Sequence, residues 1–361
     1  MPVVLHTEAS RGLGGQELRT VAETRWLLAH GWNALIAGQP ESRLLAEARE
    51  AGVPAVAVPM RGAADLRALL ALRRLMRARG ASLVHTHSSV DSWLGGLAAK
   101  SLGLAVVRSR HVSIRIRRGL VYRLADRVIT SGEAVRDIVV AAGVPRARVV
   151  SVPPGVDTAR FHGGVSGAAV RDEFRLPAGA PVVGLVANVR GSKGHNVFLE
   201  AARDVLAAAP DARFLIVGDG VGFDEVARRV REAGLEARVV MTGFRRDVPE
   251  VMAALDVLAL PSIKSEATSQ VIPQALAVGT PVVASTVGGS PELIRDGQTG
   301  RLVPPGDARA LAAAILDLLR DREAARRLAR AGQAEVQARF TLDAAMARTT
   351  AVYRELLGLT I

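Results

Sequence analysis

Short apolar runs alternate along the whole chain with longer stretches of helical periodicity. The first run is Val3–Thr7, and comparable runs recur through both halves. Between them, apolar residues recur every three or four positions, as in Glu17–His30, which is the spacing of an amphipathic helix. Because parallel strands are joined by helical crossovers, the pattern predicts an α/β fold with parallel, doubly wound sheets.

Two sets of strands are predicted. The first half is expected to hold strands at Val3–Thr7, Asn33–Gly38, Ala55–Pro59, Leu83–His85, Ala105–Arg108, Arg127–Thr130 and Val149–Val152. The second half is expected to hold strands at Pro181–Asn188, Phe214–Val217, Val239–Thr242, Val257–Leu260, Val282–Ser285 and Leu302–Val303. Two helical patterns close the chain, Ala308–Ala338 with a break near residues 320–322, and Leu342–Leu357.

The turn residues Pro153-Pro154-Gly155 and Phe161-His162-Gly163-Gly164 mark the best domain boundary. We therefore expect a Rossmann-like domain at residues 1–155, a second at 156–340, and a helix at 341–361 that packs back toward the first. Two such domains facing each other would form a cleft where their strand ends meet.

Composition narrows the class of protein. The 361 residues include no cysteine, which excludes disulfides, thiolate metal sites and a cysteine nucleophile. No run of 18 apolar residues occurs, and the chain enters a strand without a signal-peptide pattern. These features favour a cytoplasmic protein.

The net charge of +12 points to anionic partners or to a coding bias toward arginine, which supplies all but three of the 47 basic residues. Nucleic acid is disfavoured, because only 3% of residues are aromatic and no recognition motif is present. The helix predicted at Leu66–Arg79 sets leucines against arginines, and Arg115, Arg117 and Arg118 follow. It is either a surface helix packed on its sheet or a peripheral contact with an anionic membrane.

A glycine-rich loop separates the first strand from the first helix. Gly14, Gly15 and Gln16 stand where backbone N–H groups at a helix start suit a phosphate or sugar oxygen. The alternative is a loop that needs positive φ. The spacing is not G-x-G-x-x-G, so a dinucleotide oxidoreductase is the weakest of the functions considered.

Histidines follow two strand ends of the first half. His85 and His87 follow one strand, and His111 follows another. They are either structural or placed to bind a sugar hydroxyl or phosphate. Nothing in their spacing supports a metal site.

The second half carries two cations at a comparable place. Arg190 and Lys193 lie in the turn Arg190-Gly191-Ser192-Lys193-Gly194-His195 after its first strand. Such a pair suits a diphosphate, because arginine grips two oxygens and lysine gives a compact charge. Two solvated cations on a turn are the alternative.

Further candidates end later strands. Gly243, Phe244 and Arg245 are placed to line a nucleobase pocket or to form a turn. The segment Pro261–Ser285 carries Glu266 in a loop and Gln274 on the following helix. A carboxylate at a strand end and a helix start suit a sugar hydroxyl and a phosphate, respectively.

The ordered motifs resemble family-4 glycosyltransferases of the two-Rossmann GT-B type over nearly the full length. The resemblance rests on Gly14-Gly15, His85-Thr86-His87, Pro154-Gly155-Val156-Asp157, Arg190 with Lys193-Gly194, Pro261-Ser262 with Glu266, Gly279-Thr280-Pro281, Gly288-Gly289-Ser290-Pro291-Glu292 and Asp296-Gly297 with Gly300. In detail, the sequence is similar to family members that assemble lipopolysaccharide and cell-surface glycans.

The resemblance implies a retaining, hexosyltransferase-like enzyme that uses a UDP-, GDP- or ADP-linked sugar and requires no metal or other cofactor. Arg190 and Lys193 would stabilise the leaving diphosphate, and Glu266 would contact the donor sugar. The backbone of Thr268, Ser269 and Gln270 would meet phosphate. The first domain would bind a glycolipid or polysaccharide acceptor, with His111 near the sugar and Gly15 near the phosphate.

Gln274 departs from the family pattern, which has a second glutamate there. Glutamine keeps an acceptor and adds donors but loses the charge, so ribose binding survives and a role as base does not. Two other hypotheses stay open: a non-catalytic homologue that binds nucleotide sugars, and a sugar-nucleotide epimerase.

Overall fold

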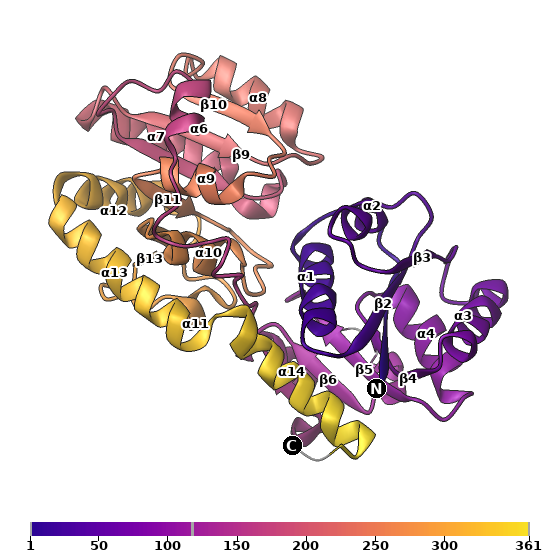
Figure 1. Ribbon diagram of the computed structural model, residues 1–361. Coiled ribbons are helices and arrows are strands. Elements are labelled where there is room, and N and C mark those ends of the chain that lie inside the picture. The colour runs from indigo at the N-terminus through magenta and orange to yellow at the C-terminus, as the bar shows by residue number, and fades with distance from the viewer. Residues whose placement is uncertain (1, 117–118, 360–361) are drawn as a thin grey trace. The chain divides into compact units, whose positions relative to one another are not determined.

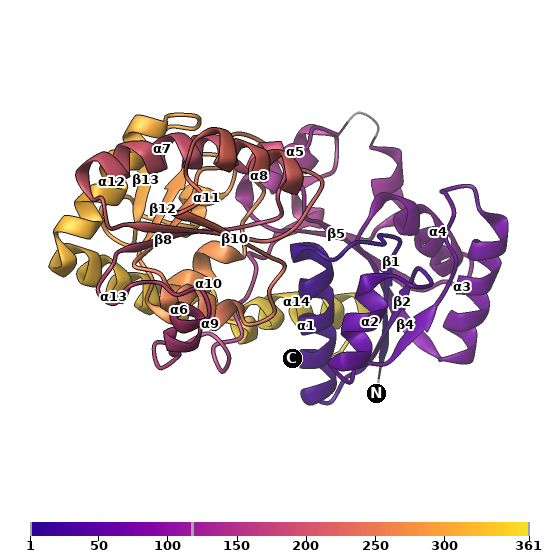
Figure 2. The same ribbon diagram turned by 90° about the horizontal axis from the view of Figure 1, so that it is seen from above.

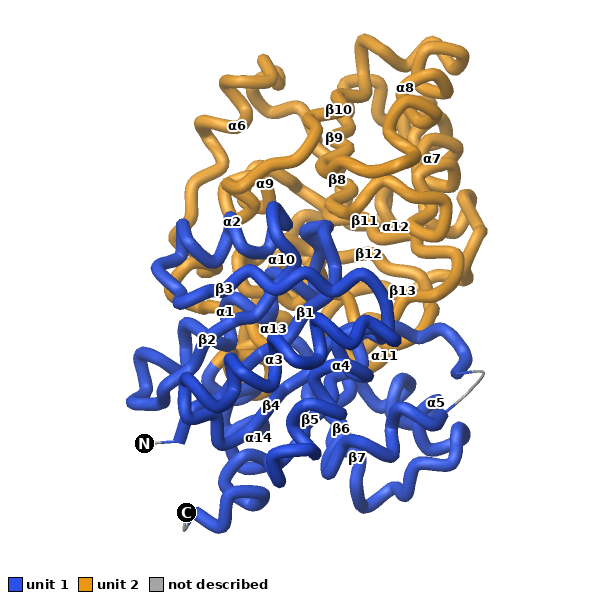
Figure 3. Tube along the Cα trace, turned by 90° about the vertical axis from the view of Figure 1, so that its right-hand side faces the viewer, with its two compact units in different colours: residues 1–154, 343–361 blue, residues 155–342 orange. Residues whose placement is uncertain are grey.

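The computed structural model describes residues 2–116 and 119–359. The chain forms two compact units, Met1–Pro154 with Asp343–Ile361 (unit 1) and Gly155–Leu342 (unit 2), coloured separately in Figure 3. The predicted divisions fell after residues 155 and 340, and the structure divides after 154 and 342.

Unit 1 is built on a seven-stranded parallel sheet of order β3-β2-β1-β4-β5-β6-β7. Its strands are β1 (Val3–Glu8), β2 (Asn33–Gly38), β3 (Ala55–Ala57), β4 (Ala81–Thr86), β5 (Ala105–Arg110), β6 (Arg127–Thr130) and β7 (Val149–Ser151). Its helices are α1 (Gly15–Ala29), α2 (Arg43–Glu50), α3 (Leu66–Ala78), α4 (Ser89–Lys100), α5 (Glu133–Ala141) and α14 (Leu342–Leu357), with short 3-10 turns η1 (Leu120–Leu124) and η2 (Arg146–Arg148). Figure 1 labels β2 to β6 of this sheet and the helices α1 to α4 beside it.

Strand alternation divides the core of unit 1 between the two faces of this sheet. Leu35 and Ala37 of β2 belong to the apolar cluster that also contains α3 and α4. Ile36, between them, packs with α1 and α2 on the other face. A strand that buries both faces shows this pattern, because successive side chains point to opposite sides.

Unit 2 is built on a six-stranded parallel sheet of order β10-β9-β8-β11-β12-β13. Its strands are β8 (Val182–Val186), β9 (Arg213–Val217), β10 (Val239–Gly243), β11 (Val257–Leu260), β12 (Val282–Ser285) and β13 (Arg301–Val303). Its helices are α6 (Ala168–Glu173), α7 (His195–Ala208), α8 (Phe223–Glu232), α9 (Val248–Ala254), α10 (Val271–Val278), α11 (Ser290–Leu293), α12 (Ala308–Arg320) and α13 (Arg322–Arg339), with the 3-10 turn η3 (Gly191–Lys193).

Helices cover both faces of the unit 2 sheet. Figure 2 shows α7, α8 and α12 along one side and α6, α9 and α10 along the other. Helices α12 and α13 are separated at Asp321. Its carboxylate accepts a hydrogen bond from the Ala324 N–H and so caps the start of α13. The break predicted near residues 320–322 is confirmed.

The predicted fold class of two Rossmann-like parallel sheets is confirmed. Within the described residues, no helix is both long enough and apolar enough to cross a bilayer. Arg117 and Arg118, which the sequence assigned to a basic patch, lie outside the described residues.

Candidate active site

The strand order of unit 2 reverses between β8 and β11, which are neighbours in its sheet. The loops that leave such strands diverge to opposite faces, and open α/β sheets bind ligands in the crevice between them. The loop after β8 spans residues 187–194, and the loop after β11 spans residues 261–270. Most residues predicted to hold a nucleotide sugar lie on these two loops.

Lys193 and Glu266 form an ion pair across this switch point. The Lys193 ammonium donates to Glu266 Oε2 at 2.6 Å, and Ser262 Oγ donates to the same oxygen at 2.6 Å. Only 13% of the lysine side chain and 6% of the glutamate side chain are exposed. Because desolvation offsets much of the attraction in a buried pair, stability alone does not account for it. The pair is therefore the leading candidate for binding or catalysis.

Glycines allow the loop that carries Glu266 to be packed tightly from two sides. A Cβ at Gly194, whose φ is +75°, would lie 1.8 Å from the Pro261 carbonyl oxygen. A Cβ at Gly288, whose φ is +57°, would lie 1.6 Å from the carbonyl oxygen of Glu266 itself. Both conformations suit glycine alone, so backbone contact fixes the position of the Glu266 carboxylate.

Arg190 and His195 flank Lys193 in the chain. Arg190 is exposed, and its side chain has no ion-pair partner among the described residues. His195 is buried at the first position of α7, and burial lowers its pKa to about 4. The histidine is therefore neutral at physiological pH, and Arg190 and Lys193 supply the positive charge of this turn.

The residues predicted to meet phosphate lie at the start of α10. Thr268 and Ser269 are buried, and Gln270 is the N-cap of the helix. Thr268 Oγ1 is shielded from solvent and has no hydrogen-bond partner in the described chain. Gln274 lies one turn into α10 and is half-buried. Free N–H groups of a helix start and an unused hydroxyl together suit an anionic or polyhydroxyl ligand.

The third predicted donor segment follows β10. Gly243 has a φ of +73°, and Phe244 is 45% exposed. The Arg245 guanidinium is held by Glu173 and Asp247, and these hydrogen bonds raise its pKa further above its ordinary value. Arg245 is thus engaged within its own unit, which leaves the backbone and the Phe244 ring as the available contacts.

Unit 1 has a corresponding switch point between β1 and β4. Gly14 and Gly15 span the start of α1, where the Gly14 N–H donates to the Glu17 carboxylate at 2.8 Å. The Gln16 side-chain amide donates to Glu8, a buried residue at the end of β1. Burial and, next, the charge of Asp91 raise the pKa of Glu8 to about 8.

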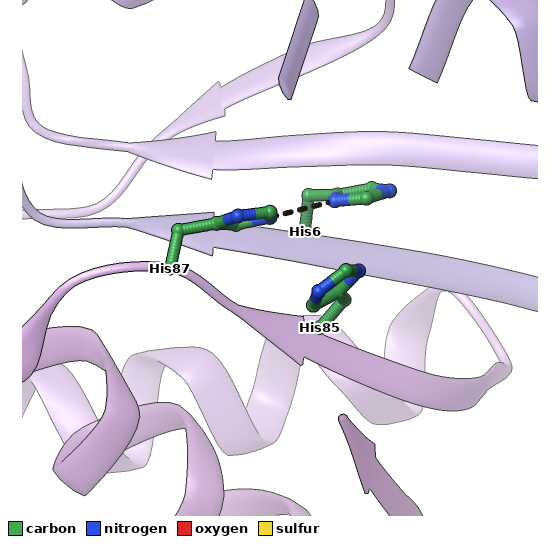
Figure 4. Close-up of side chains that lie close together, drawn as sticks. All are labelled: His6, His85 and His87. Carbon is green, nitrogen blue, oxygen red and sulfur yellow. Dashed lines mark hydrogen bonds between the residues drawn. The ribbon is translucent and has the colours of Figure 1, made fainter. Parts of the chain in front are cut away.

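The predicted histidines gather at this end of the sheet, together with His6 of β1. His6 Nδ1 lies 2.9 Å from His87 Nε2 (Figure 4), and His87 Nδ1 lies 3.3 Å from His111 Nε2. His85 is fully buried and is held at both nitrogens, by the Tyr353 hydroxyl of α14 at 2.5 Å and by Ser109 Oγ at 2.8 Å.

The nitrogens of His6, His85 and His87 lie close enough together to suggest a metal site, within 4.8 Å of one another. Ring orientation argues against one. The His85 ring stacks on the His87 ring with centroids 4.4 Å apart and planes 28° apart. A metal ion bound by imidazole nitrogens lies near the plane of each ring, and the planes of stacked rings do not converge on one such point. Both nitrogens of His85 are also already engaged. The residues fit a hydrogen-bonded imidazole cluster better than a metal centre.

Sequence reasoning missed His6, Glu8 and Asp91. His6 pairs in register with His85 across β1 and β4, so aligning the two predicted strands would have found it. Glu8 was left out because the first strand was predicted to end at Thr7. Asp91 is buried, and its carboxylate accepts hydrogen bonds from the Ser88 and His87 N–H groups at 2.8 Å, which orders the start of α4.

Comparison with known proteins gives matches over both units. The Glycosyltransferase Family 4 model matches residues 13–160, and the Glycosyl transferases group 1 model matches residues 180–321. The chain is 33% identical to a 2-deoxystreptamine N-acetyl-D-glucosaminyltransferase of Streptomyces fradiae, over 78% of this chain and 72% of that protein. It is 31% identical to a D-inositol 3-phosphate glycosyltransferase of Segniliparus rotundus, over 76% and 66% of the two chains.

Solved structures share the fold. A glycosyltransferase from Rickettsia africae superposes with a TM-score of 0.89 at 20% identity, covering 99% of each chain. Anabaena HepE in complex with UDP-glucose superposes with a TM-score of 0.86 at 22% identity, covering 99% of this chain and 100% of that one.

Proposed function

The chain belongs to the family-4, group 1 glycosyltransferases, and on that basis we propose that it transfers a hexose from a nucleotide sugar with retention of anomeric configuration. A UDP-linked sugar is the first donor to test, because the structural neighbour HepE is described in complex with UDP-glucose. Unit 2 binds the donor and unit 1 the acceptor in this proposal.

The observation that carries the proposal is the buried pair of Lys193 and Glu266 at the switch point of unit 2, with Arg190 exposed beside it. In the transfer, the bond between the anomeric carbon and the β-phosphate oxygen breaks, and negative charge grows on the leaving diphosphate. An acceptor hydroxyl oxygen forms the new bond to the same face of that carbon, and its proton passes to the leaving phosphate oxygen. Arg190 and Lys193 stabilise that charge electrostatically. Glu266 accepts a hydrogen bond from a donor-sugar hydroxyl.

The remaining donor contacts follow from the helix start. Backbone N–H groups of residues 268–270 bind phosphate, Gln274 binds the ribose hydroxyls, and Gly243 and Phe244 line the base. In unit 1, His111 contacts a sugar hydroxyl, and the loop of Gly14, Gly15 and Gln16 contacts acceptor phosphate. No metal or cofactor is required, since the two cations supply the positive charge.

The acceptor we propose is a glycolipid or polysaccharide of cell-envelope glycan synthesis, such as lipopolysaccharide. Support comes from exposed apolar side chains of unit 1: Leu66 and Leu70 of α3 are 65% and 40% exposed, and Ile114 and Leu120 are 59% and 55% exposed. Arg67 and Arg74 share the surface of α3 with these leucines. A mixed apolar and basic face suits peripheral binding to an anionic membrane at its cytoplasmic side.

Sedimentation with vesicles tests the membrane contact. The double variant Leu66→Ser/Leu70→Ser should lose binding to phosphatidylglycerol vesicles, while Val221→Ser, which removes a fully exposed apolar residue of unit 2, should not. Equal binding by all three proteins, or no binding by the wild type, would remove the support for a lipid acceptor.

A small cyclitol acceptor is the second candidate, because the relatives are named for 2-deoxystreptamine and D-inositol 3-phosphate. Incubating the protein with UDP-, GDP- and ADP-hexoses and each acceptor class separates the possibilities. A glycosylated product that retains the donor's anomeric configuration by NMR supports the proposal. Inverted product, epimerised donor without acceptor, or binding without turnover would each overturn it, the last two in favour of an epimerase or a non-catalytic homologue.

A further inference from the structure

Three imidazoles of unit 1 form one continuous line of contacts, His6 to His87 to His111. The inner contact is 2.9 Å and the outer contact is 3.3 Å between ring nitrogens. The line ends inside the core at His6 Nε2, which is buried and has no hydrogen-bond partner in the described chain. The other end is the half-buried His111, the last strand-end histidine of the unit.

The middle ring of this line is held in place. His87 stacks on His85, whose two nitrogens are fixed by Tyr353 and Ser109. Beyond His111, the Arg110 guanidinium donates to the carbonyl oxygens of Val112 and Ile114 and braces the following loop. The line is therefore ordered along its length, and its hydrogen bonds have a defined geometry.

Each neutral imidazole has one N–H donor and one bare nitrogen acceptor, so the whole line must point in one direction. If protons point inward, His6 Nε2 carries a buried N–H without an acceptor. If protons point outward, that nitrogen is a bare lone pair, and every N–H in the line has a partner or reaches the surface. Buried N–H groups without partners are rarer than under-satisfied acceptors, which favours the outward direction.

We propose that His6 and His87 are positioning residues that fix His111 as its Nδ1–H tautomer, so that His111 offers a hydrogen-bond donor to an oxygen of the bound sugar. The sugar contact rests on the proposed function, whereas the tautomer does not. His6 and His87 act only through His111. A neutral donor of fixed direction binds a hydroxyl through one of the oxygen's lone pairs and leaves the hydroxyl proton for another acceptor.

The surroundings keep the line uncharged. Burial lowers the pKa of His6 to about 3. Burial and, next, neighbouring titratable groups hold the pKa values of His87 and His111 well below their usual range. Arg19 and Arg110 are the positive neighbours of His111. The donor therefore does not depend on protonation at neutral pH.

Long-range ¹H–¹⁵N NMR of the full-length protein, labelled at its seven histidines, tests the tautomer directly and needs no substrate. Resonances are assigned by single substitution, with the exposed His162 as a reference. We expect His6, His87 and His111 as Nδ1–H tautomers that do not titrate between pH 6 and pH 8. An Nε2–H tautomer at His111 in the wild type would overturn the proposal.

Two variants of His6 then separate positioning from packing. His6→Asn keeps a donor near Nδ1, whereas His6→Phe keeps a ring of similar size without nitrogens. We expect His111 to stay an Nδ1–H tautomer in His6→Asn and to become a mixture in His6→Phe. In transfer assays, KM for the acceptor should rise about 3- to 10-fold in His6→Phe, the cost of one hydrogen bond, and recover in His6→Asn.

The two sets of measurements fail separately. Nδ1–H tautomers without sugar turnover would contradict the proposed function but would still support the positioning of His111 by His6 and His87. Identical His111 spectra in His6→Phe and the wild type would contradict the line even if the protein is an active transferase.

Discussion

The ammonium of Lys193 lies 2.6 Å from a carboxylate oxygen of Glu266, a residue 73 positions later in the chain. The contact joins the loops that follow β8 and β11 at the point where the strand order of unit 2 reverses. A cation and a carboxylate are thereby held together at the place where open α/β sheets bind their ligands.

Alanine at Lys193 or at Glu266 should lower the rate of sugar transfer about 100-fold or more, because each removes a charge aimed at the reacting donor. Unit 2 should stay folded, since its two apolar clusters do not include either residue. Transfer assays and circular dichroism check the two parts. Lys264→Ala, an exposed cation on the same loop, is the matched control and should keep full activity. Wild-type turnover in Lys193→Ala or Glu266→Ala would contradict the assignment of that residue to the active site.

Gly194→Ala should destabilise unit 2 and reduce activity together. The added Cβ would lie 1.8 Å from the Pro261 carbonyl oxygen at a φ of +75°, so the loop that carries Glu266 must move. We expect a loss of about 1–3 kcal/mol in the free energy of unfolding. Gly191→Ala in the same turn meets open space and should change neither thermal unfolding nor turnover. Equal behaviour of the two variants would show that close loop contact does not position Glu266.

Gln274→Ala should raise KM for the nucleotide sugar about 10-fold with little change in kcat, because it removes hydrogen bonds to the ribose in ground and transition states alike. Gln274→Glu keeps the acceptor oxygens and should stay within a few-fold of the wild type. A large loss of kcat in Gln274→Ala would instead place this side chain among the reacting groups. Steady-state kinetics distinguish the two results.

Acidification should destabilise unit 1 through His6. Burial lowers its pKa from 6.5 to about 3, so its contribution to stability is complete above pH 6.5 and is lost progressively as pH falls toward 3. Between pH 7 and pH 5, one such histidine lowers the free energy of unfolding by about 2 kcal/mol. His6→Phe should remove that share of the pH dependence. Denaturant unfolding followed by tryptophan fluorescence reports on unit 1 alone, since Trp26, Trp32 and Trp93 all lie there.

The pKa of Glu8 is shifted in the opposite direction to that of His6, so Glu8 should change the stability of unit 1 at alkaline pH. Its pKa is raised to about 8, so its contribution is complete below pH 4.5 and is lost as pH rises through 8. Glu8→Gln should therefore flatten the alkaline side of the stability profile, while His162→Gln in unit 2 should leave the fluorescence-detected transition unchanged.

For His6, the contradicting outcome is a profile of unfolding free energy against pH that runs parallel in His6→Phe and in the wild type. It would show that His6 is not a buried, neutral histidine.

The fold and much of the donor site were predictable from sequence, because both depend on local patterns. Strand and helix periods fixed the order of elements, and Arg190, Lys193 and Glu266 each follow a recognisable strand end. The contact between Lys193 and Glu266 was not predictable, because it depends on which strands are neighbours in the sheet.

The contacts that join His6, His87 and His111 were not predictable from the sequence for a related reason. His6 lies within an apolar strand, and only its register with His85 brings it to the cluster. The partner of His85, Tyr353, is 268 residues away on α14. Contacts of such length are set by tertiary packing, and nothing in the local pattern at either residue signals them.

We propose that the switch point of unit 2 binds a nucleotide sugar through Lys193. Thermal unfolding of the wild type and of Lys193→Ala, measured with UDP-, GDP- and ADP-sugars, tests this binding. At about 100 times Kd, the true donor should raise the unfolding temperature of the wild type by roughly 5–10 °C. The same ligand should raise that of Lys193→Ala far less. No shift with any nucleotide sugar, or an equal shift in both proteins, would contradict the claim.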